Sequence, residues 1–526
     1  MQKIKYIAVV IALFSLAMCG VALIMMPTLV AADLIISMAV IMLVAVVLAR
    51  EKIVRKPSKL IIFSIFLGLI SIPLVTIVRV FGSFDVLSLV FHTQFGVEGT
   101  TLRGFELEIF ASVFAVFAII LSGYVLGSIS GLPRFFAIVS FAVLLTFNPA
   151  LRFAWAYALH PEIESDLQFA LREPEVKLEP EIRPDIIYIY LEGLERAYGR
   201  QDIFGDIYAP LNEYADKGVT FSNVRQIRGT GWSLAGIVAT KCGLPLVPNG
   251  LRNRYGFQQQ FEFLGDHLCL STLTHRLNYQ NAFVFGGVQA FGGMDHFLRT
   301  HSIFDVTDYA AMESQYPAAV FRDARSGPIL DDALVFDAAT RVYDRLIGSD
   351  QPILLTVETY GPHGKTSLLS GDCTASGQAE TTSDVVAAIK CTLQSTQVFL
   401  DHVIATRGDR PTVVVLLSDH LNHDPALRSY FSIEERENTF IIFGVGYEPA
   451  FASAGMVVDR LASMVDVYPT VLAFAGLADP DVQAGLGRSL FGEAPTVIEE
   501  KGHQRLDREL FPNPGLSAAV WGATPE

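Results

Sequence analysis

The sequence predicts two parts: a bundle of five membrane helices at the N-terminus, followed by an α/β domain with a mainly parallel sheet covered by helices. Three observations lead to this prediction. Residues 1–160 are strongly apolar and carry a net charge of +5, whereas the whole 526-residue chain carries −15. Stretches of low charge recur in this first part. In the second part, continuous apolar runs alternate with amphipathic stretches, as in sheets that helices cover on both faces.

Five low-charge stretches approach the ~20 apolar residues that cross a ~30 Å hydrocarbon core. They lie at residues 6–26, 31–49, 60–80, 105–129 and 135–157. The first follows Lys3 and Lys5, as the apolar part of a secretory signal would. No A-x-A-like cleavage site ends it, so we interpret it as a membrane helix. Residues 1–157 are therefore expected to form a multi-pass membrane domain.

The distribution of basic residues predicts the orientation of this domain. With a cytoplasmic N-terminus, the inner segments hold eight Lys and Arg residues and the outer segments hold two, Arg79 and Arg103. This agrees with the positive-inside rule. Five spans then place the rest of the chain outside. The outer segment 81–104 has apolar residues at helical spacing, which favours a helix lying in the membrane surface; a plain connecting loop is the alternative.

The cysteines and the charge agree with an extracytoplasmic domain. Cys19 falls in the first span, and the other four cysteines, an even number, follow the last span. Three pairings are open, and we favour Cys242–Cys269 and Cys373–Cys391 because each closes a short interval. The absence of a CxxC motif makes a structural zinc site unlikely to form. The strongly acidic outer part is a poor partner for nucleic acid, whose phosphates require Lys and Arg.

The outer part divides into a linker, a domain and a tail. Residues 158–183 are rich in Glu, Pro and Leu and are interpreted as a linker, residues 184–495 as the domain, and residues 496–526 as a loosely ordered polar tail. Short apolar runs predict strands at Asp185–Leu191, Ala282–Phe285, Ile353–Val357, Thr412–Leu417 and Thr439–Phe443. An amphipathic stretch at Asp384–Val403 predicts a helix between two of them.

Polar residues that follow three of these runs predict a metal site. Glu192 follows the first run, Glu358 the third, with His363 soon after it, and Asp419 and His420 follow the fourth. Ligands of parallel sheets bind beyond the carboxyl ends of the strands, so these side chains are expected at one edge. Each residue alone is explained as a cap or loop residue. Together they favour a metal-centred site.

The segment QIRGTGWSLAGIVATKCGLP supplies a nucleophile. Its Gly-Thr-Gly-Trp-Ser turn leads into a stretch that can form a helix, Leu234–Thr240. Ser233 would lie at the positive N-terminus of that helix, where an alkoxide and a phosphate are both stabilised. The alternative role of Ser233 is to cap the helix, and Thr230 is the second candidate hydroxyl. Arg225, Arg228 and Lys241 flank Ser233 and could offset substrate charge; the alternative, favoured for at least two of them, is that they are solvated surface residues.

These motifs, in this order behind five apolar spans, resemble the membrane phosphoglycerol transferases of the lipoteichoic acid synthase and periplasmic glucan-modifying type. The specific parts are PDIIYIYLEGLER, GTGWSLAGIVATKCGLP and LLSDH, and SMVDVYPTVLAFAGL (463–477) resembles the closing helix of sulfatase-like domains. The resemblance implies an alkaline phosphatase or sulfatase-like outer domain in the periplasm and a multi-pass protein of the bacterial inner membrane.

The resemblance also implies a reaction and its residues. One divalent cation, Mn²⁺ by resemblance or else Mg²⁺ or Zn²⁺, would be held by Glu192, Ser233, Asp419 and His420. Ser233 would take phosphoglycerol from phosphatidylglycerol as a covalent phosphoglyceryl-serine and pass it to a periplasmic glucan or related acceptor. His363 would move the protons, or else act as a hydrogen-bond partner to the site.

The chain departs from the family pattern at two points. The family nucleophile is usually threonine, and Ser233 keeps the hydroxyl. The Trp and Arg that bind phosphoglycerol in lipoteichoic acid synthases have no counterpart in FGGVQAFGGMDHFLRTH (285–301), where Arg299 is the substitute; Arg228 is the other candidate for the substrate. Two alternatives follow: a phosphoethanolamine transferase acting on lipid A or glycan, and a non-catalytic binding domain. A formylglycine sulfatase is disfavoured, because Cys242-Gly-Leu-Pro245-Leu lacks the C/S-x-P-x-R spacing.

Overall fold

The computed structural model describes residues 165–248, 262–423, 427–432, 435–511 and 513–522, together with Leu87, Phe91 and Val113. The five predicted membrane spans and most of segment 81–104 lie outside these residues. Within the described part of the chain, no helix combines the length and the apolar character that crossing a bilayer requires. The chain divides into two compact units, and the second, Val86–Thr101 with Glu162–Glu526, contains the fold described below.

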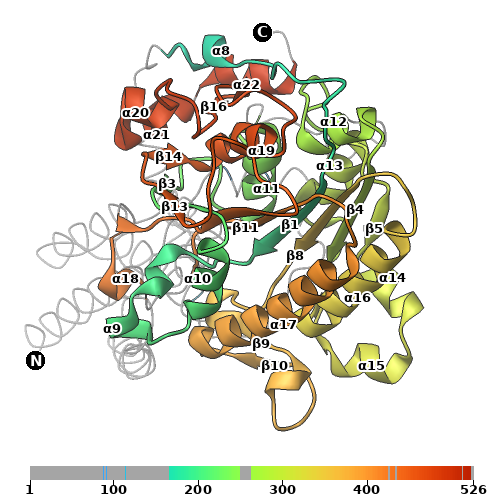
Figure 1. Ribbon diagram of the computed structural model, residues 1–526. Helices are drawn as coiled ribbons and strands as arrows, with labels where there is room; N and C mark the ends of the chain where they lie inside the picture. The colour runs from blue at the N-terminus through green and yellow to red at the C-terminus, as the bar shows by residue number, and fades with distance from the viewer. Residues whose placement is uncertain are drawn as a thin grey trace, which may run out of the picture. The chain divides into compact units, whose positions relative to one another are not determined.

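A mainly parallel sheet of eight strands forms the centre of the second unit (Figure 1). In spatial order the strands are β13 (Met456–Val458), β2 (Val219–Phe221), β12 (Phe440–Val445), β11 (Thr412–Ser418), β1 (Asp185–Leu191), β8 (Ile353–Glu358), β4 (Gln280–Phe285) and β5 (Asp305–Thr307). Among these eight, only β12 runs antiparallel to its neighbours. The predicted, mainly parallel sheet is confirmed. One correction is needed: the run at 439–443, expected to be parallel, forms the antiparallel strand β12.

Helices cover both faces of the sheet because the side chains of each central strand alternate between two cores. Ile187, Ile189 and Leu191 of β1 face one core, and Tyr188 and Tyr190 face the other. The first core is closed by α10 (Ala209–Ala215), α16 (Asp332–Leu346) and α17 (Val385–Thr406). The second is closed by α11 (Ser233–Cys242), α12 (Leu270–Arg276), α13 (Met294–Thr300) and α19 (Val467–Phe474). Every residue of β1 is buried, which explains its continuous apolar sequence.

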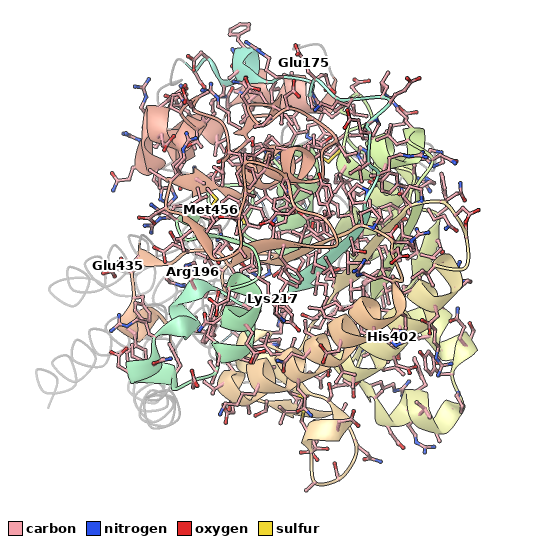
Figure 2. The ribbon with its side chains drawn as sticks, viewed as in Figure 1. Glu175, Arg196, Lys217, His402, Glu435 and Met456 are labelled. Carbon is pink, nitrogen blue, oxygen red and sulfur yellow. A yellow bond between two sulfur atoms is a disulfide. The ribbon has the colours of Figure 1, made fainter. Side chains whose placement is uncertain are left out.

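Helices α16 and α17 pack side by side on the outer layer (Figure 1). His402 of α17, labelled in Figure 2, lies 2.6 Å through its Nε2 from Oδ1 of Asp344 on α16. α17 extends the predicted helix Asp384–Val403 by three residues, and the Asp384 side chain caps its start by accepting from the Ala387 N–H. Shorter helices complete the described unit: α8 (Leu167–Ala170), α9 (Gln201–Phe204), α14 (Tyr309–Gln315), α15 (Ala318–Asp323) and α18 (Leu427–Tyr430). The remaining short strands are β3 (Val224–Arg225), β6 (Arg325–Ser326), β7 (Ile329–Leu330), β9 (Ser367–Leu369), β10 (Glu380–Thr382), β14 (Ala462–Ser463), β15 (Gln483–Ala484) and β16 (Gly487–Arg488).

The C-terminal residues are ordered, which corrects the prediction of a loose tail. They form α20 (Val497–Lys501), α21 (His503–Leu510) and α22 (Pro514–Trp521). Thr496 and Glu499 make a capping box at the start of α20. Leu506 and Leu510, four residues apart, bury one face of α21 in the same core as α11. The segment was misjudged because its apolar residues are few, although their spacing is helical.

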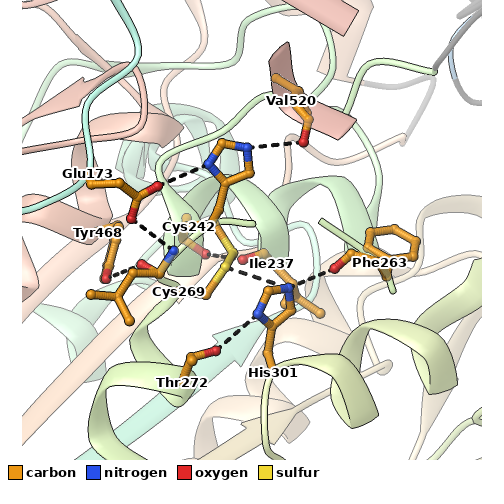
Figure 3. The surroundings of a disulfide bond; sticks show 12 residues. Glu173, Ile237, Cys242, Phe263, Cys269, Thr272, His301, Tyr468 and Val520 are labelled. Atoms are coloured by element: carbon orange, nitrogen blue, oxygen red, sulfur yellow. Dashed lines mark hydrogen bonds and ion pairs between the residues drawn. A yellow bond between two sulfur atoms is a disulfide. The ribbon is translucent and has the colours of Figure 1, made fainter. Parts of the chain in front are cut away.

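Both favoured disulfides are present, Cys242–Cys269 and Cys373–Cys391. The first joins the C-terminal end of α11 to the residue that precedes α12. Figure 3 shows its surroundings, where His301 lies with Nε2 3.7 Å from the Cys269 sulfur and 2.9 Å from the Phe263 carbonyl oxygen. The two sulfurs are bonded to each other, so they do not form a metal site with His301.

Candidate metal centre and nucleophile

The polar residues after β1 and β11 lie side by side because the two strands are parallel and in register. Leu191, the last residue of β1, pairs with Ser418, the last residue of β11. Glu192 and Asp419 are the next residue of each strand, so both leave the sheet at its carboxyl edge. Apolar strands thus place two carboxylates at the edge where parallel sheets bind their ligands.

Glu192, Asp419 and His420 form a compact group of potential metal ligands. One ligand atom from each lies within 4.8 Å of the others, and all three residues are buried. Nε2 of His420 is 3.1 Å from Oδ2 of Asp419 and 3.5 Å from Oε1 of Glu192. Nδ1 of His420 lies 2.8 Å from the Leu421 carbonyl oxygen, so it carries the proton and donates. Nε2, on the side of the two carboxylates, is therefore the ring nitrogen that could bind a cation.

Backbone contacts hold the two carboxylates in place. The Gly193 N–H donates to Oδ1 of Asp419 at 2.9 Å, and the Glu192 N–H donates to the Thr359 hydroxyl at 3.0 Å. Gly193 has a φ of 55° and packs against Asn422, so a side chain at this position would meet both strain and a clash. The turn after β1 therefore needs glycine to bring its N–H to Asp419.

The remaining carboxylate oxygens indicate that a cation fits here. Oε2 of Glu192 and Oδ2 of Asp419 are buried and make no hydrogen bond with any described residue. Leaving buried charged oxygens unpaired is costly, and a divalent cation would satisfy them. Burial, and then the neighbouring Asp419 carboxylate, raise the pKa of Glu192 well above its usual range. A bound cation would offset the repulsion between the two carboxylate charges.

Ser233 begins the helix that packs against this edge. It is the first residue of α11, after an extended Trp232, so Trp232 occupies the cap position. Gly236, one turn later on the same face, leaves no room for a Cβ beside the backbone oxygen of Asp419. The Ser233 side chain is half-buried. Thr230 is fully buried, and its hydroxyl donates to a carbonyl of its own turn at 2.8 Å, which favours Ser233 as the nucleophile.

His363 and Glu358 reach the same edge from β8. Nε2 of His363 lies 4.0 Å from Oε1 of Glu192, and about a third of its side chain is exposed. Burial of the ring, and then the neighbouring His420, lower the pKa of His363. Glu358 is fully buried, and neither of its carboxylate oxygens makes a hydrogen bond with a described residue. Burial, followed by the Asp419 charge, raises the pKa of Glu358 well above its usual range.

Two further residues of this edge were not singled out from the sequence. The His423 ring packs on the His420 ring at a centroid distance of 4.8 Å. Asn422 donates from its side chain to the Pro362 carbonyl oxygen at 2.7 Å, which joins the loop of His420 to the loop of His363. The motif SDHLNHD contains both residues, and its second histidine was the signal that could have identified His423.

The basic residues near the nucleophile have structural partners. Arg228 donates from its guanidinium to the Phe511 carbonyl oxygen at 2.9 Å, and Arg299, exposed on α13, lies 2.9 Å from Nδ1 of His296. Their roles toward substrate stay predictions. Lys241 is fully buried beneath the sheet, with Nζ 2.8 Å from the Thr356 hydroxyl, and burial lowers its pKa to about 7. Lys241 therefore packs in the core instead of flanking the substrate.

The sequence of this domain matches a known family. The family model described as Sulfatase matches residues 184–477, more than half of the chain, so the chain belongs to the Sulfatase family. Phosphoglycerol transferase I of Escherichia coli is 28% identical over 382 residues, which are 70% of this chain and 47% of that protein. A Shigella boydii protein of the same name has the same identity and coverage. The chain therefore spans about half the length of these curated relatives.

The solved structures that resemble the chain are less similar in sequence. The lipooligosaccharide phosphoethanolamine transferase EptA of Neisseria meningitidis is 14% identical, with a TM-score of 0.47 over 89% of this chain and 95% of that chain. The lipoteichoic acid synthase LtaP of Listeria monocytogenes is 14% identical, with a TM-score of 0.44 over 62% of this chain and 78% of that chain.

Although the chain belongs to the Sulfatase family, its residues do not fit the formylglycine chemistry of sulfatases. That chemistry would need an unbonded cysteine or a serine in the C/S-x-P-x-R pattern. Cys242, the residue nearest to such a pattern, is bonded to Cys269. Ser233 therefore stays the predicted nucleophile.

Proposed function

We propose that this chain transfers phosphoglycerol from phosphatidylglycerol to a periplasmic glucan or related acceptor through a phosphoglyceryl-serine at Ser233. The convergence of Glu192, Asp419 and His420 beside the helix that Ser233 begins is the observation that carries this proposal. The names of the relatives support the phosphoglycerol group as the transferred unit.

The chain's residues suit a divalent cation held by Glu192, Asp419, His420 and Ser233. When bound, such a cation supplies Lewis-acid stabilisation of phosphate charge and lowers the pKa of the hydroxyl. Its identity is proposed as Mn²⁺, with Mg²⁺ and Zn²⁺ as alternatives. The unpaired oxygens of Glu192 and Asp419 are the structural support for this assignment.

Ser233 and His363 carry out the bond changes in the proposed reaction. Oγ of Ser233 loses its proton and attacks the phosphorus, and the bond from phosphorus to the diacylglycerol oxygen breaks. His363, neutral at the start, takes the Ser233 proton and gives it to the departing diacylglycerol oxygen. It then takes the proton of the acceptor hydroxyl, which attacks phosphorus, and passes that proton to Oγ of Ser233 as the bond from phosphorus to Oγ breaks. The lowered pKa of His363 leaves the ring neutral at neutral pH, so it starts each acceptor step as a base.

The proposed reaction fits the proposed organisation of the chain. Residues 1–157 would span the inner membrane five times, residues 158–183 would link them to the periplasmic domain 184–495, and residues 496–526 would complete that domain. The donor lipid stays in the bilayer, so a tethered site gains proximity that a soluble enzyme lacks.

Replacing the nucleophile tests the proposal. Ser233→Ala should abolish release of diacylglycerol from phosphatidylglycerol vesicles, because the variant lacks the hydroxyl that forms the covalent intermediate. Ser233→Thr should retain activity. Ser314→Ala, an exposed serine on α14, is the matched control and should behave as the wild type. The measurement is diacylglycerol release by the full chain, with the mass of the Ser233 peptide after exposure to the lipid.

The mass on Ser233 distinguishes the alternatives. Phosphoglycerol on Ser233 supports the proposal. Phosphoethanolamine on Ser233, from vesicles containing both lipids, would instead indicate a phosphoethanolamine transferase. Normal diacylglycerol release by Ser233→Ala would refute the nucleophile, and no adduct from either lipid would favour a binding domain.

A further inference from the structure

An aromatic residue far in sequence from the family-matched region packs against Trp232, the residue before Ser233. Leu87 and Phe91 are both helical, stand four positions apart in the sequence, and have no exposed surface. Both belong to the compact unit that contains the Sulfatase domain, although they precede residue 184 by about ninety positions. Segment 86–101 therefore contributes buried residues to the same unit as the candidate site.

Phe91 lies at the centre of an aromatic cluster formed by four distant parts of the sequence. Its ring centroid is 5.5 Å from Trp232, 6.2 Å from Phe263 and 6.0 Å from Trp521. Phe263 and Trp521 also contact each other, at 5.2 Å. The Trp521 ring is held in place by a hydrogen bond, in which its Nε1–H donates to the Val247 carbonyl oxygen at 2.7 Å. The Trp232 ring therefore packs on one side against Phe91, which is itself supported by Phe263 and the last helix.

Trp232 determines where α11 starts. Its backbone is extended, and its carbonyl oxygen accepts the N–H of Gly236 at 2.9 Å, the first hydrogen bond of the helix. Ser233 is the next residue. A change in the position of the Trp232 ring would be transmitted through one peptide bond to the nucleophile.

We propose that Phe91 is a positioning residue, which holds the Trp232 ring and thereby sets Ser233 against the Glu192, Asp419 and His420 group. The inference rests on the proposed function. It also gives segment 86–101 a role, because in the sequence this segment lies between the predicted spans 60–80 and 105–129. The nucleophile would then be held by a segment that follows one membrane span and precedes the next.

Kinetics of the full chain in lipid vesicles test this role. Phe91→Ala should lower kcat about tenfold, since a small misplacement of a reacting group costs about that much or more, with KM for phosphatidylglycerol within about twofold. Phe91→Leu, which keeps most of the apolar volume, should restore kcat to within about threefold of the wild type. Phe297→Ala is the matched control, because Phe297 is equally buried and packs on Phe263 at 5.8 Å. It should lower thermal stability similarly and leave kcat unchanged.

The fluorescence of Trp232 tests its contact with Phe91 independently of activity. In a Trp155→Phe, Trp521→Phe background, Trp232 is the remaining tryptophan, and Phe91→Ala should shift its emission to longer wavelength. Unchanged kcat in Phe91→Ala, or an equal fall in kcat in Phe297→Ala, would overturn the proposal. A wild type without lipid turnover would instead refute the proposed function. In that case the Trp232 emission would test the packing of Phe91 on Trp232, and an unchanged spectrum in Phe91→Ala would contradict it.

Discussion

At the residue scale, the two buried carboxylates set the chemistry of the site. Glu192 and Asp419 lie in register at the ends of β1 and β11, and each has an oxygen without a hydrogen bond in the described structure. Natural proteins rarely leave such groups unpaired. A stability cost at this position is therefore evidence of a ligand-binding role.

Binding of a divalent cation should stabilise the protein through these residues. Thermal stability of the metal-free full chain should rise on addition of Mn²⁺, by about 2.7 kcal/mol at a hundred times the dissociation constant. Glu192→Gln and Asp419→Asn should remove this response, because each loses a charged ligand. Glu175→Gln, at the exposed position labelled in Figure 2, is the control and should keep it. An unchanged response in both site variants would contradict the ligand set.

His301 gives a pH prediction at the residue scale. It is 1% exposed, and burial lowers its pKa to about 4 from an ordinary value near 6.5. The unfolded chain therefore binds a proton between these values that the folded chain does not. Its contribution opposes folding increasingly as pH falls from about 6.5 to about 4, by up to about 3 kcal/mol.

Replacing His301 should flatten this dependence. His301→Gln should lose less stability than the wild type between about pH 6.5 and about pH 4.5, measured by thermal unfolding. His402→Gln, a half-buried histidine on α17 that lies beside Asp344, is the control for removal of a histidine elsewhere in the fold. A His301 variant with the wild-type slope would show that another group titrates.

At the element scale, α11 links the proposed nucleophile to the rest of the fold. Ser233 begins it, and Cys242 ends it in a disulfide to Cys269, which precedes α12. The Cys373–Cys391 bridge instead joins a short loop helix to α17. The two bridges close intervals of 27 and 18 residues, so their effects on chain entropy are similar.

Removal of either disulfide should lower stability, whereas only one of the two removals should lower activity. Cys242→Ser with Cys269→Ser, and Cys373→Ser with Cys391→Ser, should each cost about 3 kcal/mol in the free energy of unfolding. Only the first pair should also lower kcat for diacylglycerol release, because it frees the end of the nucleophile helix. Equal effects on kcat would indicate that α11 is held by packing alone.

The elements could be predicted where burial alone determines them. The apolar runs beginning at Asp185 and Thr412 gave β1 and β11 to within one residue, because strands buried on both faces need no polar alternation. The reversed direction of β12 was not predictable, since direction depends on how the chain reaches the strand. The site residues at strand ends were predicted for the same reason as the strands. The partners that hold them, such as the Gly193 N–H and Asn422, depend on turns that carry no periodic signal.

At the scale of the whole molecule, the end of the chain completes the domain. His503 of α21 lies with Nε2 3.0 Å from the Gln226 carbonyl oxygen, and the Gln226 side chain accepts from the Leu421 N–H at 2.7 Å. The C-terminal helices therefore contact the loop before the nucleophile, which in turn contacts the loop after His420. The polar composition of this segment hid its packing from sequence analysis, although apolar residues such as Leu510 and Leu516 are buried.

The proposed membrane topology gives a prediction for the whole chain. Arg55→Cys, between the second and third predicted spans, should face the cytoplasm, and Glu175→Cys should face the periplasm. In a Cys19→Ser background the other four cysteines are bonded in disulfides, so each introduced thiol is the one that reacts. A membrane-impermeant maleimide on spheroplasts should label Glu175→Cys and leave Arg55→Cys unlabelled until the membrane is opened. The basic residues around Arg55 cause this asymmetry, because the positive-inside rule retains them in the cytoplasm. Labelling of both positions before the membrane is opened would mean an even number of spans between them, instead of the three predicted.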